Sequence, residues 1–131
     1  EMTEPAETCS LDPYHSGQTE IIRRIHDRIT EDLRRRYTID ELSRQYTINT
    51  AALKAVFKSV YGLPIASYMK HYRISRAAQM LRETDESISS ISASVGYESQ
   101  SKFSKAFKDV MNILPTDYRK KMLVNQTLTR E

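Results

Sequence analysis

Small, polar and basic side chains recur at helical spacing in two stretches of this sequence, 50–58 and 100–108, and neither stretch contains an acidic residue. A glutamine can pair with adenine through two hydrogen bonds, and a lysine can donate to O6 and N7 of guanine. An alanine at such a position offers only apolar contact. The residues concerned are Thr50, Ala51, Lys54, Ala55 and Lys58 in the first stretch and Gln100, Ser101, Lys102, Ser104, Lys105 and Lys108 in the second. This chemistry favours the major groove of double-stranded DNA as the ligand.

The first stretch needs a helix whose opposite face is buried, and the sequence supplies one. Thr38 and Glu41 form a capping box, which predicts a short helix that ends near Tyr46. Asn49 is predicted to cap the next helix, and Gly62 to end it. The apolar face of that helix consists of Leu53, Val56, Phe57 and Val60.

The same pattern returns in the second half of the sequence. Ser87 is predicted to cap a short helix, Gly96 to make a turn, and Ser99 to cap the helix that carries the second stretch. Pro115 suits the first position of a last helix, which we expect to end at about Leu123. The apolar positions of these helices are Ile88, Ile91, Val95, Phe103, Ala106, Phe107 and Val110.

The two halves are copies of one unit. The pair Phe57-Lys58 recurs as Phe107-Lys108, a shift of 50 residues, whereas Leu42 and Ile91, upstream of the turns, differ by 49. The second turn is therefore expected to be one residue longer. These observations predict an all-α fold of about seven helices, in which two helix-turn-helix units are joined by a linker helix.

The expected domain boundaries follow from these elements. Residues 1–17 are predicted to be a disordered linker, since proline, serine and glycine interrupt them without periodicity. A first unit spans 18–63 and opens with a helix from about Gln18 to Tyr37. The linker helix spans 64–83, the second unit 84–123, and a C-terminal tail 124–131. The apolar face of the opening helix is formed by Ile22, Ile25, Ile29 and Leu33.

Charge is unevenly distributed along the chain. Four of the 17 acidic residues lie in 1–17, where no lysine or arginine occurs, so residues 18–131 hold 13 acidic against 20 basic residues, a net +7. A basic folded part is typical of proteins with a polyanionic partner.

Other classes of protein are disfavoured. Cys9 is the only cysteine, so no disulfide can form within the chain, and a reducing, cytoplasmic location is expected. No apolar run is long enough to span a membrane, and no signal peptide is evident. His15, His26 and His71 lack metal-ligand spacing. We therefore expect no enzyme, no metal and no cofactor. Because the sequence begins with Glu1, we expect a fragment of a longer protein.

From Thr38 to Arg119 the sequence resembles the DNA-binding domain of the AraC/XylS family of bacterial transcription regulators. Asn112 stands where the family usually has glycine, and Ile65 where proline is frequent; asparagine tolerates the left-handed conformation. The resemblance rests on Leu42-Ser43, Leu53, Phe57-Lys58, Gly62, Tyr68, Arg73-Ile74, Ala77, Leu81, Ile91-Ser92, the run Val95–Lys108, Pro115 and Tyr118-Arg119.

The resemblance implies which side chains read bases, namely the second, third, sixth and seventh residues counted from each cap. It implies an operator in double-stranded DNA as the partner, RNA polymerase as a further partner, and an effector ligand, if any, bound by a domain absent from this chain. The implied readers are Thr50, Ala51, Lys54 and Ala55, and then Gln100, Ser101, Ser104 and Lys105, with Lys102 beside them.

Two alternatives stay open at this point. A helical protein-interaction module without DNA readout would show apolar or acidic residues on the outward faces, where this sequence has mostly basic and polar ones. RNA binding would need an aromatic stacking surface, and none is evident. Within the DNA hypothesis, we expect the second unit to discriminate bases more than the first, because Ala51 and Ala55 lack hydrogen-bonding groups.

Overall fold

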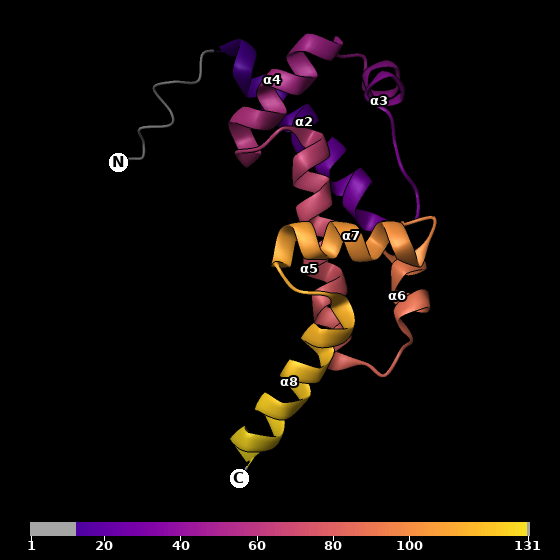
Figure 1. Ribbon diagram of the computed structural model, residues 1–131. Helices are drawn as coiled ribbons and strands as arrows, with labels where there is room; N and C mark the ends of the chain where they lie inside the picture. The colour runs from indigo at the N-terminus through magenta and orange to yellow at the C-terminus, as the bar shows by residue number, and fades with distance from the viewer. Residues whose placement is uncertain (1–12, 131) are drawn as a thin grey trace, which may run out of the picture. The chain divides into compact units, whose positions relative to one another are not determined.

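The computed structural model describes residues 13–130, and within that range the chain forms seven α-helices and no strand (Figure 1). The predicted all-α fold of about seven helices is confirmed. Residues 1–12 of the predicted linker lie outside the described range. The helices are α2 (Pro13–Glu31), α3 (Ile39–Tyr46), α4 (Thr50–Tyr61), α5 (Ile65–Glu83), α6 (Ile88–Ser94), α7 (Gln100–Met111) and α8 (Pro115–Arg130).

Helix α2 differs at both ends from the predicted range of about Gln18 to Tyr37. It begins at Pro13, inside the predicted linker, because the fixed φ of proline suits the first turn of a helix. It ends at Glu31, where a turn takes over. The Asp32 side chain accepts a hydrogen bond from the backbone N–H of Arg34 at 3.1 Å, a local alternative to the helical pattern.

The described residues form two compact units, and neither is continuous in sequence. The first contains α2, residues 37–64 and the first turn of α5 as far as Tyr68. The second contains Asp32–Arg36 and the chain from Met69 onward. The helix predicted to be a linker is therefore shared by both units.

The core of the first unit is built by three helices. Helix α4 packs against α2 and α3. Helices α2 and α4 each contribute an apolar stripe, α3 contributes Leu42, and Ile48 comes from the turn between α3 and α4. The buried apolar residues of this unit are Ile22, Ile25, Ile29, Leu42, Ile48, Leu53, Val56 and Phe57.

The core of the second unit is formed by residues of α5, α6, α7 and α8, and α7 packs against α6 and α8. Leu33 was predicted to extend the apolar face of the opening helix. It belongs to this second core instead, because α2 has already ended at Glu31. The residues that follow, Asp32–Arg36, form a short segment of the second unit that we call the strap. The core consists of Leu33, Ile74, Ala77, Ala78, Leu81, Ile91, Val95, Phe103, Ala106, Phe107 and Tyr118.

The helix boundaries follow the predicted capping residues. Thr38 and Glu41 form the complete capping box. The other three predicted caps are Asn49, Ser87 and Ser99, and a side-chain oxygen of each accepts a hydrogen bond from a backbone N–H in the first turn of its helix. Gly62 and Asn112 end α4 and α7 in the same left-handed conformation, with φ of 86° and 63°. The replacement of the usual glycine by Asn112 therefore preserves the turn.

Helix α8 runs past the predicted end near Leu123 and takes in most of the predicted tail 124–131. No proline or glycine follows Pro115, so no residue type stops the helix.

The Arg119 guanidinium of α8 binds the end of α5. It donates to three carbonyl oxygens there and just beyond, those of Leu81, Thr84 and Glu86, at 3.1, 3.1 and 2.7 Å. These bonds satisfy carbonyls that the helix end leaves unpaired.

Candidate nucleic-acid interface

Helix α4 presents one buried and one exposed face. Leu53, Val56 and Phe57 are buried. The side chains predicted to face a ligand lie opposite, and four of them are exposed while Thr50 is half-buried. The exposed four are Ala51, Lys54, Ala55 and Lys58.

These four exposed residues line an open groove that the sequence did not predict. Its volume is about 560 Å³. Ile39 at the start of α3 and the chain around the start of α5 supply the other walls. Those additional lining residues are Ile39, Pro64, Ile65 and Ala66. The groove thus joins the exposed face of α4 to apolar surface from two neighbouring elements.

Helix α7 repeats this arrangement with a different surface. The Ser99 hydroxyl accepts from the backbone N–H of Lys102 at 3.1 Å, and Phe103, Ala106 and Phe107 are buried. Of the predicted site residues on α7, only Ser104 is half-buried. The exposed ones are Gln100, Ser101, Lys102, Lys105 and Lys108.

Two ion pairs involve the basic surface of the second unit. Lys102 Nζ lies 2.5 Å from a Glu98 carboxylate oxygen, and this hydrogen bond and positive charge lower the pKa of Glu98. Lys70 Nζ lies 3.2 Å from a carboxylate oxygen of Asp109, the first acidic residue after the stretch 100–108. Both pairs are exposed and therefore contribute little to stability.

Helices α4 and α7 are each held by an aromatic pair of the same kind. Phe57 meets Tyr68 edge to face, with ring centroids 5.4 Å apart and an interplanar angle of 77°. Phe107 meets Tyr118 at 5.5 Å and 67°. The residues of each pair correspond by the 50-residue shift. The internal repeat in sequence is therefore also a repeat of packing.

The first unit adds a histidine to its aromatic pair. His26 stacks on Tyr61 with centroids 4.4 Å apart, and its Nε2 lies 2.7 Å from the Tyr68 hydroxyl. Burial raises the pKa of Tyr61. His26, which lacks metal-ligand spacing in the sequence, therefore packs between α2 and the residues that hold α4.

The turn before α7 is built around a buried arginine. Arg73 on α5 is 4% exposed and donates to the backbone carbonyls of Leu33 and Val95, the latter at 2.8 Å. Burial lowers its pKa to about 10, so it stays charged near neutral pH. Gly96, with φ of 92°, passes so close that a Cβ there would collide with the Arg73 guanidinium and with the Leu33 carbonyl oxygen.

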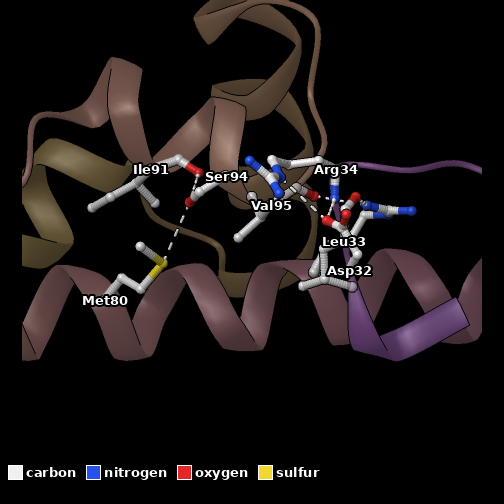
Figure 2. Close-up of polar contacts among 8 residues, drawn as sticks. Asp32, Leu33, Arg34, Met80, Ile91, Ser94 and Val95 are labelled. Carbon is white, nitrogen blue, oxygen red and sulfur yellow. Dashed lines mark hydrogen bonds and ion pairs between the residues drawn. The ribbon is translucent and has the colours of Figure 1, made fainter. Parts of the chain in front are cut away.

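The surroundings of this turn include a second arginine. Arg36 Nε donates to the Gly96 carbonyl oxygen at 2.8 Å, and its guanidinium lies 5.0 Å from the centre of the Tyr97 ring. Figure 2 shows Leu33 and Val95 near each other and Ser94 between Ile91 and Met80. The Ser94 hydroxyl donates to the Ile91 carbonyl oxygen at 2.9 Å.

The sequence predicted the turn at Gly96 but missed its partners. One signal was available, because Arg73 lies one helical turn before Ala77 on the apolar stripe of α5. The length of the turn was predicted correctly. The first residues of α6 and α7 are separated by one residue more than those of α3 and α4.

Metal binding and membrane insertion receive no support from the described residues. No group of three or more histidine, cysteine, aspartate or glutamate side chains there could hold a metal ion. No described helix is both long and apolar enough to cross a membrane.

Comparison with known proteins places this arrangement in a family. Residues 42–121 match the model of a helix-turn-helix domain. A putative AraC-like transcription regulator from Streptomyces lividans is 39% identical over 89 residues, which cover 68% of this chain and 29% of that protein. The transcriptional activator AarP from Providencia stuartii is 30% identical over 102 residues, 78% of this chain and 76% of AarP.

Solved structures agree on the fold. The DNA-binding domain of AdpA, a global transcriptional factor solved in complex with a target DNA, aligns with a TM-score of 0.72 over 84% of this chain and 96% of that one. At 15% identity, this likeness shows the fold alone. With the family match, the conclusion is direct: the chain belongs to the AraC family of helix-turn-helix transcription regulators. It spans 29% of the length of its Streptomyces relative.

Proposed function

We propose that this chain binds double-stranded DNA sequence-specifically, with α4 and α7 each inserted into the major groove, and that it thereby regulates transcription. The observation that carries the proposal is the repeated reading helix. Each copy has 12 residues, a polar N-cap, a buried phenylalanine and an exposed face without an acidic side chain in its first nine residues. Helices of this kind present their early residues to base edges.

The two units should read successive major grooves on one face of the duplex. Helix α5 has 19 residues, which gives it a length of about 28 Å at about 1.5 Å per residue. That length is of the same order as one turn of B-DNA, about 34 Å. We therefore expect a bipartite operator whose half-sites lie about 10 base pairs apart.

The proposal assigns a role to each class of exposed residue. Gln100, Ser101 and Lys105 discriminate bases in the second half-site, whereas Lys54 is the main hydrogen-bonding reader in the first. Lys58 and Lys108 lie near the C-terminal ends of their helices and contact phosphate. Thr50, Lys102 and Ser104 lie beside these residues, and they contribute hydrogen bonds to bases or to phosphate.

The wider role is part of the same proposal. The chain acts without catalysis, in the cytoplasm, as the DNA-reading part of a regulator. RNA polymerase is its further partner, and an effector ligand, if one exists, binds outside this chain. The support is the relatives' description as transcription regulators and the larger size of the Streptomyces protein.

Selection of bound sequences from a pool of random duplexes, followed by footprinting, tests the proposal. We expect an enriched bipartite sequence and two protected patches about 10 base pairs apart. Binding should weaken steeply as salt rises, because phosphate contacts release counterions. A single short patch that is unchanged in Lys105→Ala would count against two-unit reading, and absence of any enriched sequence would contradict the proposal.

A further inference from the structure

The exposed face of α4 differs from that of α7 in one chemical respect. Ala51 and Ala55 expose methyl groups where the equivalent positions of α7, 50 residues later, carry Ser101 and Lys105. In the first unit these methyl groups open onto the groove next to α4, whereas the residues at the same places on α7 are polar.

The composition of the groove restricts what it can bind. Six of the eight residues that line it are apolar, and the other two are lysines. Neither an alanine nor a proline side chain can hydrogen-bond a base. Lys54 and Lys58 border the apolar surface and favour an anionic ligand. The occupant should therefore combine an apolar group with a surrounding negative charge.

Duplex DNA offers such a combination at one kind of position. The C5-methyl group of thymine is the apolar group that base edges present in the major groove, and phosphates flank it on both strands. We propose that the groove bounded by Ala51 and Ala55 is a site for the C5-methyl group of a pyrimidine. The first unit thus reads thymine by its methyl group, and it should accept 5-methylcytosine in the same place.

This inference rests on the proposed DNA binding and adds a specificity to it. The two units would use different chemistry, since the second reads hydrogen-bonding groups alone, whereas the first adds recognition of methyl groups to the hydrogen bonds of Lys54. Cytosine methylation in the first half-site would then strengthen binding.

The test replaces thymine by deoxyuridine in a duplex taken from the random-pool selection. This change removes the methyl group and leaves base pairing intact. Half-sites are assigned first, because Lys105→Ala should relax base preference only in the second. We expect each methyl group removed in the first half-site to weaken binding about fourfold, which is the change in affinity that corresponds to the burial of about one CH₂ group. The same replacement in the second half-site should change binding less than twofold.

Matched variants place the effect on the groove. Ala51→Ser puts a hydroxyl group into it and should bring the thymine-to-deoxyuridine ratio close to one. The reverse exchange in the second unit, Ser101→Ala, should create a preference for thymine there. Both positions are exposed, and circular dichroism melts identical to those of the unaltered chain would show that folding is retained.

A second probe separates methyl recognition from recognition of the whole base. A cytosine placed at a thymine position of the first half-site should gain about fourfold in affinity when it is replaced by 5-methylcytosine.

The outcomes distinguish the inference from the proposed function. If no duplex binds, both fail. If a duplex binds but thymine and deoxyuridine are equivalent in the first half-site, only the inference fails. If Ala51→Ser leaves the ratio unchanged, the groove does not face bases and the inference is wrong. An apolar segment of a protein partner would then be the occupant to examine.

Discussion

Gly96→Ala should destabilise the second unit through contacts that the structure identifies. Gly96 has a φ of 92°, in the left-handed region that an alanine adopts at a cost of about 1–2 kcal/mol. The added Cβ would also collide with the Arg73 guanidinium and with the carbonyl oxygen of Leu33. The second of these is the backbone of Leu33, whose side chain is buried in the core, so it cannot move aside without disturbing that core.

The magnitude follows from what Arg73 must give up. Its guanidinium donates to two backbone carbonyls, and a hydrogen bond to a charged group is worth about 1.5–3 kcal/mol. If one of these bonds is lost in addition to the backbone cost, the free energy of unfolding falls by about 2.5–5 kcal/mol. Small domains have about 5–15 kcal/mol in total, so much of the stability of the second unit would be lost.

Gly62→Ala is the matched control. Gly62 has a φ of 86°, but no atom lies within 4 Å of a Cβ added there. It should therefore cost only the backbone term, about 1–2 kcal/mol. Urea unfolding followed by circular dichroism suits both variants, because the sequence has no tryptophan. Equal destabilisation by the two substitutions would show that the close approach to Arg73 and Leu33 has no energetic weight.

Three further predictions concern the reading helices. Phe107→Ala should lower the free energy of unfolding by about 3–5 kcal/mol, because a fully buried ring is replaced by a cavity; a thermal melt like that of the unaltered chain would contradict this. Lys58→Ala and Lys108→Ala should each weaken binding to all duplexes alike and reduce the salt slope by about one; a change in base preference would speak against phosphate contact. Lys105→Ala should relax preference at one or two positions of its half-site and Lys54→Ala at one at most, measured against every base substitution at fixed salt; the opposite order would make the first unit the main hydrogen-bonding reader.

Most of the fold could be predicted because its signals are local. Thr38, Asn49 and Ser99 cap helices through side chains that bond within the next turn, and such bonds depend on neighbours in sequence. The apolar stripe of each helix has the same property, which is why Phe57 and Phe107 were placed correctly in the core.

The errors arose where a long-range contact decides the structure. Leu33 continues the periodicity of α2 in sequence, yet it packs in the second core, and Arg73 binds its carbonyl from 40 residues away. Nothing in the local sequence reports either contact. The end of α8 was placed too early for a different reason, because no proline or glycine follows Pro115 to mark where the helix stops.

The candidate site divides in the same way. The exposed residues of α4 and α7 follow from periodicity, since they lie opposite the buried face. The groove beside Ala51 does not, because its other walls come from Ile39 and from the chain around Pro64. Only the folded arrangement brings these three elements together.

The strap Asp32–Arg36 has a consequence for how the chain is made. Arg36 bonds to Gly96, a residue 60 positions later. A ribosome that adds about 5–20 residues per second needs roughly 3–12 s to cover that interval. The first unit is complete at Tyr68, so it can pack during the later part of that time, while Leu33 still lacks the core that will bury it. The second unit thus closes on a segment synthesised long before the rest of it, and a fragment that starts at Met69 would lack that segment altogether.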